Sequence, residues 1–143
     1  MAPAGGTYGS FSPDKGPAGD EDAFVRKYDT NGNVLWTRQF GSPDQEYGFY
    51  VTAGVGGVYI TGYTYGTLPG QTSSGGIDAF VAKYNAIGIA QWVAQCGTSD
   101  VDAATSASAV FGGVYIVGNT YGTLPGQTSA GGGDAFLAFM SAR

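Results

Sequence analysis

Carboxylates are the side chains on which acid–base chemistry would have to rest, because the chain contains no histidine. Asp44 and Asp100 occupy the same position in two repeats 56 residues apart, and Glu46 and Asp102 follow two residues later. A glycosidase needs two such groups facing each other across a cleft at about 5–9.5 Å. Acids that recur once per repeat are instead typical of solvated turns. A Ser-His-Asp triad, a Cys-His pair and a His-rich zinc site are excluded as well. We therefore expect no catalytic residue and no enzyme activity.

Metal chemistry has one weak candidate, the stretch Asp29-Thr-Asn-Gly-Asn33. It resembles the beginning of a calcium loop, but the remaining spaced ligands and the terminal Glu are missing. A hairpin turn at Asn-Gly is the favoured interpretation, because both residues tolerate positive φ. Asp22, Asp78 and Asp134 each precede Ala-Phe, where we expect them to accept hydrogen bonds from backbone amides. No metal site and no cofactor is expected.

The remaining candidate is a decapeptide that occurs twice without change, as residues 64–73 and 120–129. Pro-Gly in its centre fits a type II turn, which would explain a purely structural loop. Its aromatic, amide and hydroxyl side chains are also the mixture that binds sugars. Recent duplication of the unit would produce the same identity with no ligand at all, so both interpretations remain open for the six candidate ligand-binding residues. They are Tyr65, Gln71, Thr72, Tyr121, Gln127 and Thr128.

The decapeptide belongs to a longer repeat with a period of 56 residues. Residues 22–77 and 78–133 align without a gap and share 30 identities. Such a period is typical of propellers, solenoids and arrays. We expect a loop with a partial repeat at 1–21, two full units at 22–77 and 78–133, and the first strand of a third unit at 134–143. Strands are predicted at 22–29, 34–40, 46–53, 58–63, 79–84, 91–96, 103–109, 114–118 and 135–140.

The fold class that follows is all-β, built from antiparallel four-stranded meanders. The 26 glycines between aromatic and β-branched runs indicate many short strands joined by turns. Four strands in about 50 residues have the size of a propeller blade. The second unit lacks the Asn-Gly turn, and this makes its packing the less certain of the two.

Four motifs carry a resemblance to a known family: Asp-Ala-Phe-Val-Ala-Lys-Tyr, Asn-Gly-Asn-Val-Leu-Trp-Thr-Arg-Gln-Phe-Gly, Gly-Val-Tyr-Ile-Thr-Gly-Tyr-Thr and Gly-Thr-Leu-Pro-Gly-Gln-Thr-Ser. Together they resemble the bacterial SBBP β-propeller repeat over nearly all of residues 7–139. The resemblance implies propeller blades, an extracellular or cell-surface location and no catalytic residues to carry over.

By analogy with propellers, the small-residue strand 103–109 and its counterpart 46–53 would be innermost, and the Trp strands outermost. The chain would then hold the outer two strands of one blade, one full blade and three strands of another. Five aromatic residues are predicted to be structural or to contribute to assembly. They are Phe24, Trp36, Phe80, Trp92 and Phe136.

Composition limits the partners. The net charge is −5 with no basic cluster, which argues against nucleic acid and anionic membranes. No stretch is apolar enough for a membrane helix, and no signal peptide is visible. Cys96, the lone cysteine, is predicted to be a buried thiol. With two units and fractions of others, we expect self-association into a ring or, by a slight preference, a filament. The alternative is a glycan-binding propeller segment.

Overall fold

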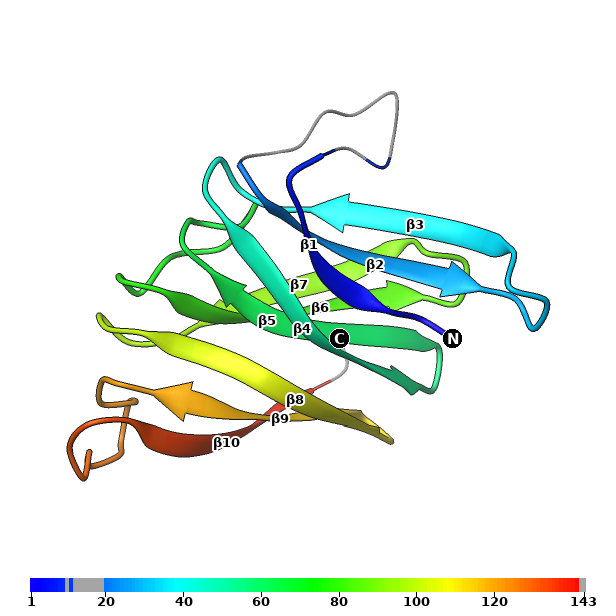
Figure 1. Ribbon diagram of the computed structural model, residues 1–143. Helices are drawn as coiled ribbons and strands as arrows, with labels where there is room; N and C mark the ends of the chain where they lie inside the picture. The colour runs from blue at the N-terminus through cyan, green and yellow to red at the C-terminus, as the bar shows by residue number, and fades with distance from the viewer. Residues whose placement is uncertain (10, 12–19, 142–143) are drawn as a thin grey trace.

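The computed structural model describes residues 1–9, 11 and 20–141, and in these residues the chain is all-β (Figure 1). Its ten strands form three antiparallel sheets of three, four and three strands. The sheets follow one another in chain order and lie face to face, with the four-stranded sheet in the middle (Figure 1). Nowhere in this described part is there a helix long and apolar enough to cross a membrane.

The middle sheet is a simple meander in which each strand pairs with the next along the chain. Its strands are β4 (Glu46–Gly54), β5 (Gly57–Thr64), β6 (Asp78–Asn85) and β7 (Ala90–Cys96). The register shifts between Gly48 and Tyr50, so Phe49 is an extra residue opposite β5. A bulge of this kind strengthens the local twist of a strand.

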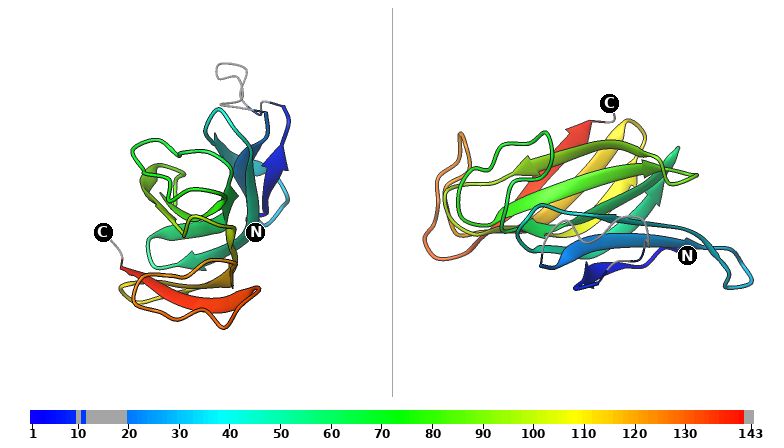
Figure 2. Two further views of the ribbon diagram at one scale, coloured as in Figure 1. Left: turned by 90° about the vertical axis from the view of Figure 1, so that its left-hand side faces the viewer. Right: turned by 90° about the horizontal axis from the view of Figure 1, so that it is seen from above.

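Each flanking sheet is a three-stranded version of the same meander. The N-terminal sheet contains β1 (Ala4–Thr7), β2 (Asp22–Tyr28) and β3 (Val34–Phe40), and the C-terminal sheet contains β8 (Asp102–Val110), β9 (Gly113–Thr120) and β10 (Asp134–Ser141). Among the described residues, the N-terminal sheet has no counterpart of β4 and the C-terminal sheet has no counterpart of β7. The planes of the three sheets are inclined to one another, so that the sheets diverge from one side of the molecule (Figure 2).

Strand β1 corrects the prediction of a loop through residue 21. Ala4–Thr7 pairs with β2 so that Thr7 lies opposite Asp22, as Thr64 of β5 lies opposite Asp78 of β6. The segment has little β-propensity of its own, but the free edge of β2 offers it backbone partners. The N-terminal sheet therefore has three strands rather than the two expected. The rest of the predicted loop, residues 10 and 12–19, lies outside the described residues.

Two apolar layers hold the sheets together, one on each face of the middle sheet. Phe80 and Ile60 are fully buried on the side of the N-terminal sheet, and Val81 and Tyr59 are buried on the side of the C-terminal sheet. Strand β6 is thus buried on both faces, and this explains why its sequence is almost continuously apolar rather than alternating.

The predicted inner and outer strands lie at opposite edges of the sheets. Strand β4 contacts both β1 and β8, and β8 is built largely from Ala and Ser. Trp36 and Trp92 lie on the outer edge strands β3 and β7, where both are partly buried against the apolar layers. The Trp36 indole nitrogen donates to the carbonyl of Ala86 in the β6–β7 turn at 3.1 Å.

The two outer hairpin turns have the same structure despite their different sequences. In the first, Asp29 Oδ1 accepts from the amides of Asn31 and Asn33 (both 2.8 Å). In the second, Asn85 Oδ1 accepts from the amides of Ile87 and Ile89 (3.1 and 2.8 Å). The predicted hairpin turn is present, and only the glycine of each turn has positive φ. In the second unit, the Asn85 side-chain oxygen holds the turn without the Asn-Gly sequence.

The repeat offers a matched pair for testing the core. Phe80 is fully buried, whereas Phe136, at the same position one repeat later, is only partly buried. Replacing Phe80 by Ala should lower the free energy of unfolding by about 3–5 kcal/mol, and the same change at Phe136 should cost clearly less. Urea denaturation followed by tryptophan fluorescence measures both. Equal losses at the two positions would contradict the burial difference.

Candidate functional site

The decapeptide forms the same loop in both places. The carbonyl of Leu68 accepts from the amide of Gln71 at 3.0 Å, and Gly70 has φ +74°, which is a type II turn at Pro69-Gly70. Pro125-Gly126 repeats it, with the same distance between Leu124 and Gln127. The predicted turn is therefore confirmed in both copies. The turn gives the loop a fixed backbone conformation. A side chain from another strand can form hydrogen bonds with that backbone.

In the middle sheet that residue is Gln95, from the outer strand β7. Its Oε1 accepts from the amide of Leu68 (2.9 Å), and its Nε2 donates to the carbonyl of Gly66 (2.9 Å) and to Asp78 Oδ2 (2.8 Å). The backbone amide of Gln95 donates to Gln71 Oε1 at 3.1 Å. One side chain thus ties the loop, the entry of β6 and the outer strand together.

Gln39 makes the same bonds in the N-terminal sheet. Its Nε2 donates to the carbonyl of Gly9 (2.9 Å) and to Asp22 Oδ2 (2.7 Å), while its Oε1 accepts from the amide of Phe11 (2.9 Å). Phe11 stands where Leu68 stands in the middle repeat. The bonding pattern is therefore a property of the repeat, preserved even where the loop sequence has diverged.

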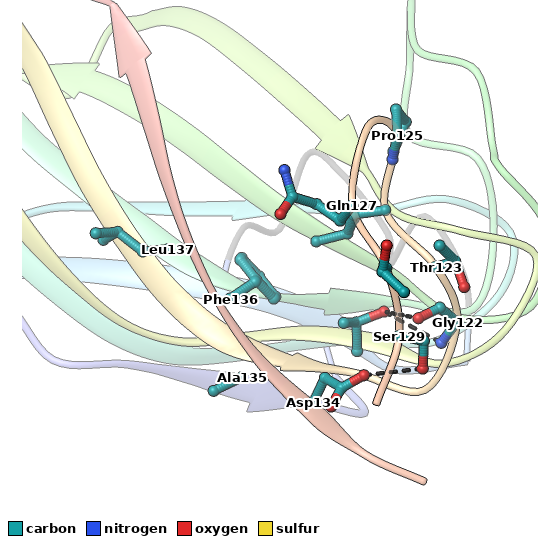
Figure 3. Close-up of a pocket in the computed structure, with 12 residues that line it drawn as sticks. Gly122, Thr123, Pro125, Gln127, Ser129, Asp134, Ala135, Phe136 and Leu137 are labelled. Carbon is teal, nitrogen blue, oxygen red and sulfur yellow. Dashed lines mark hydrogen bonds between the residues drawn. The ribbon is translucent and has the colours of Figure 1, made fainter. Parts of the chain in front are cut away.

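In the part of the chain that the structure describes, no such strand lies beside the third copy of the site, which is open. A pocket of about 350 Å³ lies between the loop that follows β9 and the beginning of β10 (Figure 3). Gly122, Leu124, Asp134 and Phe136 line it, and these are the counterparts of the residues around Gln95. Leu68 and Asp78 are buried, whereas Leu124 and Asp134 are partly exposed. The loop nonetheless keeps its form, with Ser129 Oγ donating to Asp134 Oδ2 at 2.9 Å.

The structure separates the six predicted ligand-binding residues. Gln127 and Thr128 line the open pocket, but Tyr121 does not and is 62% exposed beside it. In the middle repeat Gln71 is bonded to strand β7, and Thr72 is exposed. Tyr65 lies in a different place, against other aromatic residues. The six residues thus do not form one shared site.

Sequence reasoning missed two features here. Gln39 and Gln95 lie one 56-residue period apart, so their equivalent positions in the repeat could have predicted a common role. The second feature is a cluster of four aromatic rings with centroids 5.0–6.5 Å apart. It consists of Tyr47, Phe49, Tyr63 and Tyr65. Phe49 and Tyr65 are about half exposed, at 50% and 48%.

All four carboxylates near the start of β4 and β8 were expected to be solvated, but only two of them are. Asp44 and Asp100 are exposed, but Glu46 and Asp102 are fully buried. Glu46 bends back onto its own turn, where its Oε2 accepts from the amide of Ser42 (2.7 Å) and its Oε1 from the hydroxyl of Thr64 (2.6 Å). Burial raises the pKa of Glu46, an effect that its hydrogen bonds oppose. These are interior structural acids, not groups facing across a cleft.

The entry carboxylates of the second and third repeats behave as predicted. Asp78 Oδ2 accepts from the amide of Ser74 (2.9 Å), and Asp134 Oδ2 accepts from the amide of Ala130 (3.0 Å). Asp22 accepts from Gln39 Nε2, as Asp78 accepts from Gln95 Nε2. Among the described residues no group of three or more His, Cys, Asp or Glu side chains could hold a metal ion.

Cys96 packs partly buried against the apolar layer beside the C-terminal sheet. Burial raises the pKa of its thiol to about 11, with the carboxylates of Asp102 and Asp78 adding to the effect. A thiol with so high a pKa is protonated at neutral pH and is a poor nucleophile.

Comparison with known proteins gives one partial likeness. No protein-family model matches the chain. The chain is similar to the regulatory protein FlaEY of Caulobacter vibrioides, with 33% identity over 133 residues. The alignment covers 84% of this chain but only 14% of that protein's length, so the likeness is to a segment of it.

Removing the Gln95 side chain should destabilise the fold. Gln95→Ala leaves the Leu68 amide and the Gly66 carbonyl without their partner, which costs about 1–3 kcal/mol. Gln91, exposed in the same strand and bonded only to neighbouring carbonyls, is the matched control. Urea denaturation of Gln95→Ala and Gln91→Ala measures the difference. A loss no larger for Gln95 than for Gln91 would mean that the glutamine does not hold the loop.

Glu46 predicts a direction for pH dependence. A carboxyl whose pKa is raised by folding contributes stability that is complete below its ordinary pKa near 4.5. That contribution is lost as pH rises through the folded-state pKa. Urea titrations between pH 4 and 8 should therefore show that Glu46→Gln gains stability relative to the unmodified chain as pH rises. Asp44→Asn, at an exposed position, should show no such trend. An unchanged difference across this range for Glu46→Gln would refute the assignment.

Proposed function

We propose that the chain is a non-enzymatic structural repeat module whose sheets are propeller-type blades and which associates head to tail into an oligomer or filament. One observation carries the proposal: the outer face of the C-terminal sheet is the counterpart of a face that is buried elsewhere in the molecule. Tyr59 and Val81 are 2% and 0% exposed beneath the C-terminal sheet. Their counterparts Tyr115 and Leu137 are 45% and 67% exposed.

The opposite end of the stack presents the complementary face. Phe24 and Arg26 lie on the outer side of the N-terminal sheet, at the positions of the fully buried Phe80 and Ala82. Phe11 packs on them, with its ring 4.9 Å from that of Phe24 and 4.4 Å from the Arg26 guanidinium. Its counterpart Leu68 is buried between two sheets, so Phe11 is compatible with a further sheet placed on this face.

Face-to-face stacking agrees better with the structure than the sharing of one strand between copies. As far as the structure describes the chain, the N-terminal sheet lacks an inner strand and the C-terminal sheet lacks an outer one. A single donated strand could not complete both. Repeated stacking of end faces closes into a ring if the rotation permits and otherwise extends as a filament. The splayed sheets, the converging inner strands and the SBBP-like motifs support blades, and that family implies an extracellular or cell-surface setting.

The partial relative is consistent with a modular role. FlaEY is named a regulatory protein, and its likeness to this chain is confined to a small part of its length. A structural building block is expected to recur as a segment within longer proteins, and the matching segment of FlaEY fits that expectation. The contacts that recur from repeat to repeat each have a structural explanation, so none of them requires a catalytic role.

Glycan binding is the second candidate, and the aromatic cluster of Tyr47, Phe49, Tyr63 and Tyr65 is the observation that favours it. Exposed aromatic faces beside hydroxyl groups stack on sugar rings. Of the six residues predicted from the decapeptide to bind a ligand, Tyr65 alone belongs to this cluster. Binding of a sugar by the isolated chain on a glycan array, lost in Phe49→Ala, would favour this function over the first.

Light scattering coupled to gel filtration tests the assembly. We expect a mass above the 14.6 kDa of one chain at micromolar concentration, because exposed apolar end faces are buried by association. Leu137→Lys should shift the mass towards the monomer, whereas Val55→Lys, at a turn position 79% exposed, should not. A stable 14.6 kDa species for the unmodified chain would sink the proposal.

A further inference from the structure

We propose that the free edge of β10 and the adjoining pocket form a binding site for an extended peptide segment with the sequence pattern Trp-x-x-Gln. The inference rests on the equivalence of the three sheets used in the proposed function, but not on head-to-tail association. Two copies of this site are occupied within the chain, by Trp36-Thr-Arg-Gln39 and Trp92-Val-Ala-Gln95. The third copy is open.

The occupied copies define what the open one recognises. In each, an outer strand pairs antiparallel with the Phe-containing strand, and its glutamine lies opposite that phenylalanine. The glutamine then bonds a glycine carbonyl, the amide two residues later and the entry aspartate. In the third copy these groups belong to Gly122, Leu124 and Asp134, and all three residues line the pocket. Glutamine fits because it offers one acceptor and two donors in a fixed arrangement.

Strand β10 supplies the backbone half of the site. Within the described residues it pairs with β9 on one side, and no strand pairs with its other edge. An open edge presents alternating N–H and C=O groups that an extended peptide can bind by strand addition. The register of β6 with β7 places Gln95 opposite Phe80 and Trp92 opposite Lys83. A bound peptide in the same register would place its glutamine opposite Phe136 and its tryptophan opposite Phe139.

An unpartnered polar atom at the neighbouring outer strand points independently to the same missing segment. The indole nitrogen of Trp36 donates to the Ala86 carbonyl in the outer hairpin turn of the next sheet, and Arg38 donates to Gly88 in that turn. Trp92 is the counterpart of Trp36, yet its indole nitrogen is buried without a hydrogen-bond partner in the described structure. A hollow of about 130 Å³ lined by Trp92, Phe139 and Met140 lies beside it. Within the described residues, nothing takes the place at this indole that the Ala86 carbonyl takes at Trp36.

The occupant that we assign is an extended peptide segment with the Trp-x-x-Gln pattern that is not already part of a completed sheet. Strands β3 and β7 of a second copy do not qualify, because their glutamines are bonded within their own sheets. The specificity would come from two anchors three residues apart: a glutamine in the pocket and a tryptophan against Phe139. Main-chain bonds to β10 would add affinity without adding selectivity.

Fluorescence anisotropy of a labelled synthetic peptide tests the site on the full chain. The probe is residues 33–41 of this chain, Asn-Val-Leu-Trp-Thr-Arg-Gln-Phe-Gly. We expect saturable binding that is weakened about tenfold or more when the glutamine of the peptide is changed to Ala, because three hydrogen bonds, one of them to a carboxylate, are lost. Phe139→Ala in the protein should weaken binding similarly. Phe111→Ala, at a turn position 94% exposed, is the matched control and should not.

Amide shifts in NMR spectra locate the bound peptide. Leu124 and the residues of β10 should shift on titration, whereas Leu68, whose site is occupied by Gln95, should not. No saturable binding, or equal binding of the Gln→Ala peptide, would overturn the inference. Light scattering on the same samples reports association separately. If the chain is monomeric and binds the peptide, only the proposed assembly is refuted. If the chain is oligomeric and does not bind the peptide, only this site is refuted.

Discussion

Burial of the middle sheet on both faces is the constraint on which the rest of the structure depends. Strand β6 is apolar at nearly every position, and such a strand is stable only between two other layers. The N-terminal sheet covers Phe80 and the C-terminal sheet covers Val81, so each flanking sheet is needed by the middle one. The flanking sheets use the same repeat sequence but have a neighbour on one side only. The apolar outer face with Leu137 is a direct result.

The strands could be predicted from the sequence because turns and patterns agree at every boundary. Gly-rich turns and the 56-residue period fixed nine strands to within one or two residues. Strand β1 escaped prediction because Ala4-Gly-Gly-Thr7 has no strand signal without its partner β2. Burial of Glu46 also escaped, since its position after a turn resembles that of the exposed Asp44, and only the folded turn supplies the Ser42 and Thr64 hydrogen bonds.

The candidate site was predicted in part. The type II turn of the decapeptide followed from Pro69-Gly70, because proline has a fixed negative φ and glycine tolerates the positive φ of the next position. The role of Gln95 did not follow, since the loop and the glutamine are 24 or more residues apart in sequence and meet only through sheet pairing. The glycan interpretation treated Tyr65 and Gln71 as neighbours on a surface. In the structure Tyr65 joins the aromatic cluster and Gln71 holds a backbone amide.

Identity between the two decapeptides has a structural explanation in the middle repeat but not in the last one. Around Gln95, Gly66, Leu68 and Gln71 each make a defined bond, so the sequence is constrained there by the fold. Around the open pocket, Gly122 and Leu124 have no such strand in the described chain, and yet the ten residues are unchanged. The type II turn alone would require little more than Pro125-Gly126. Retention of the whole loop is what a site adapted to receive a glutamine-bearing strand would show, whichever polypeptide provides it.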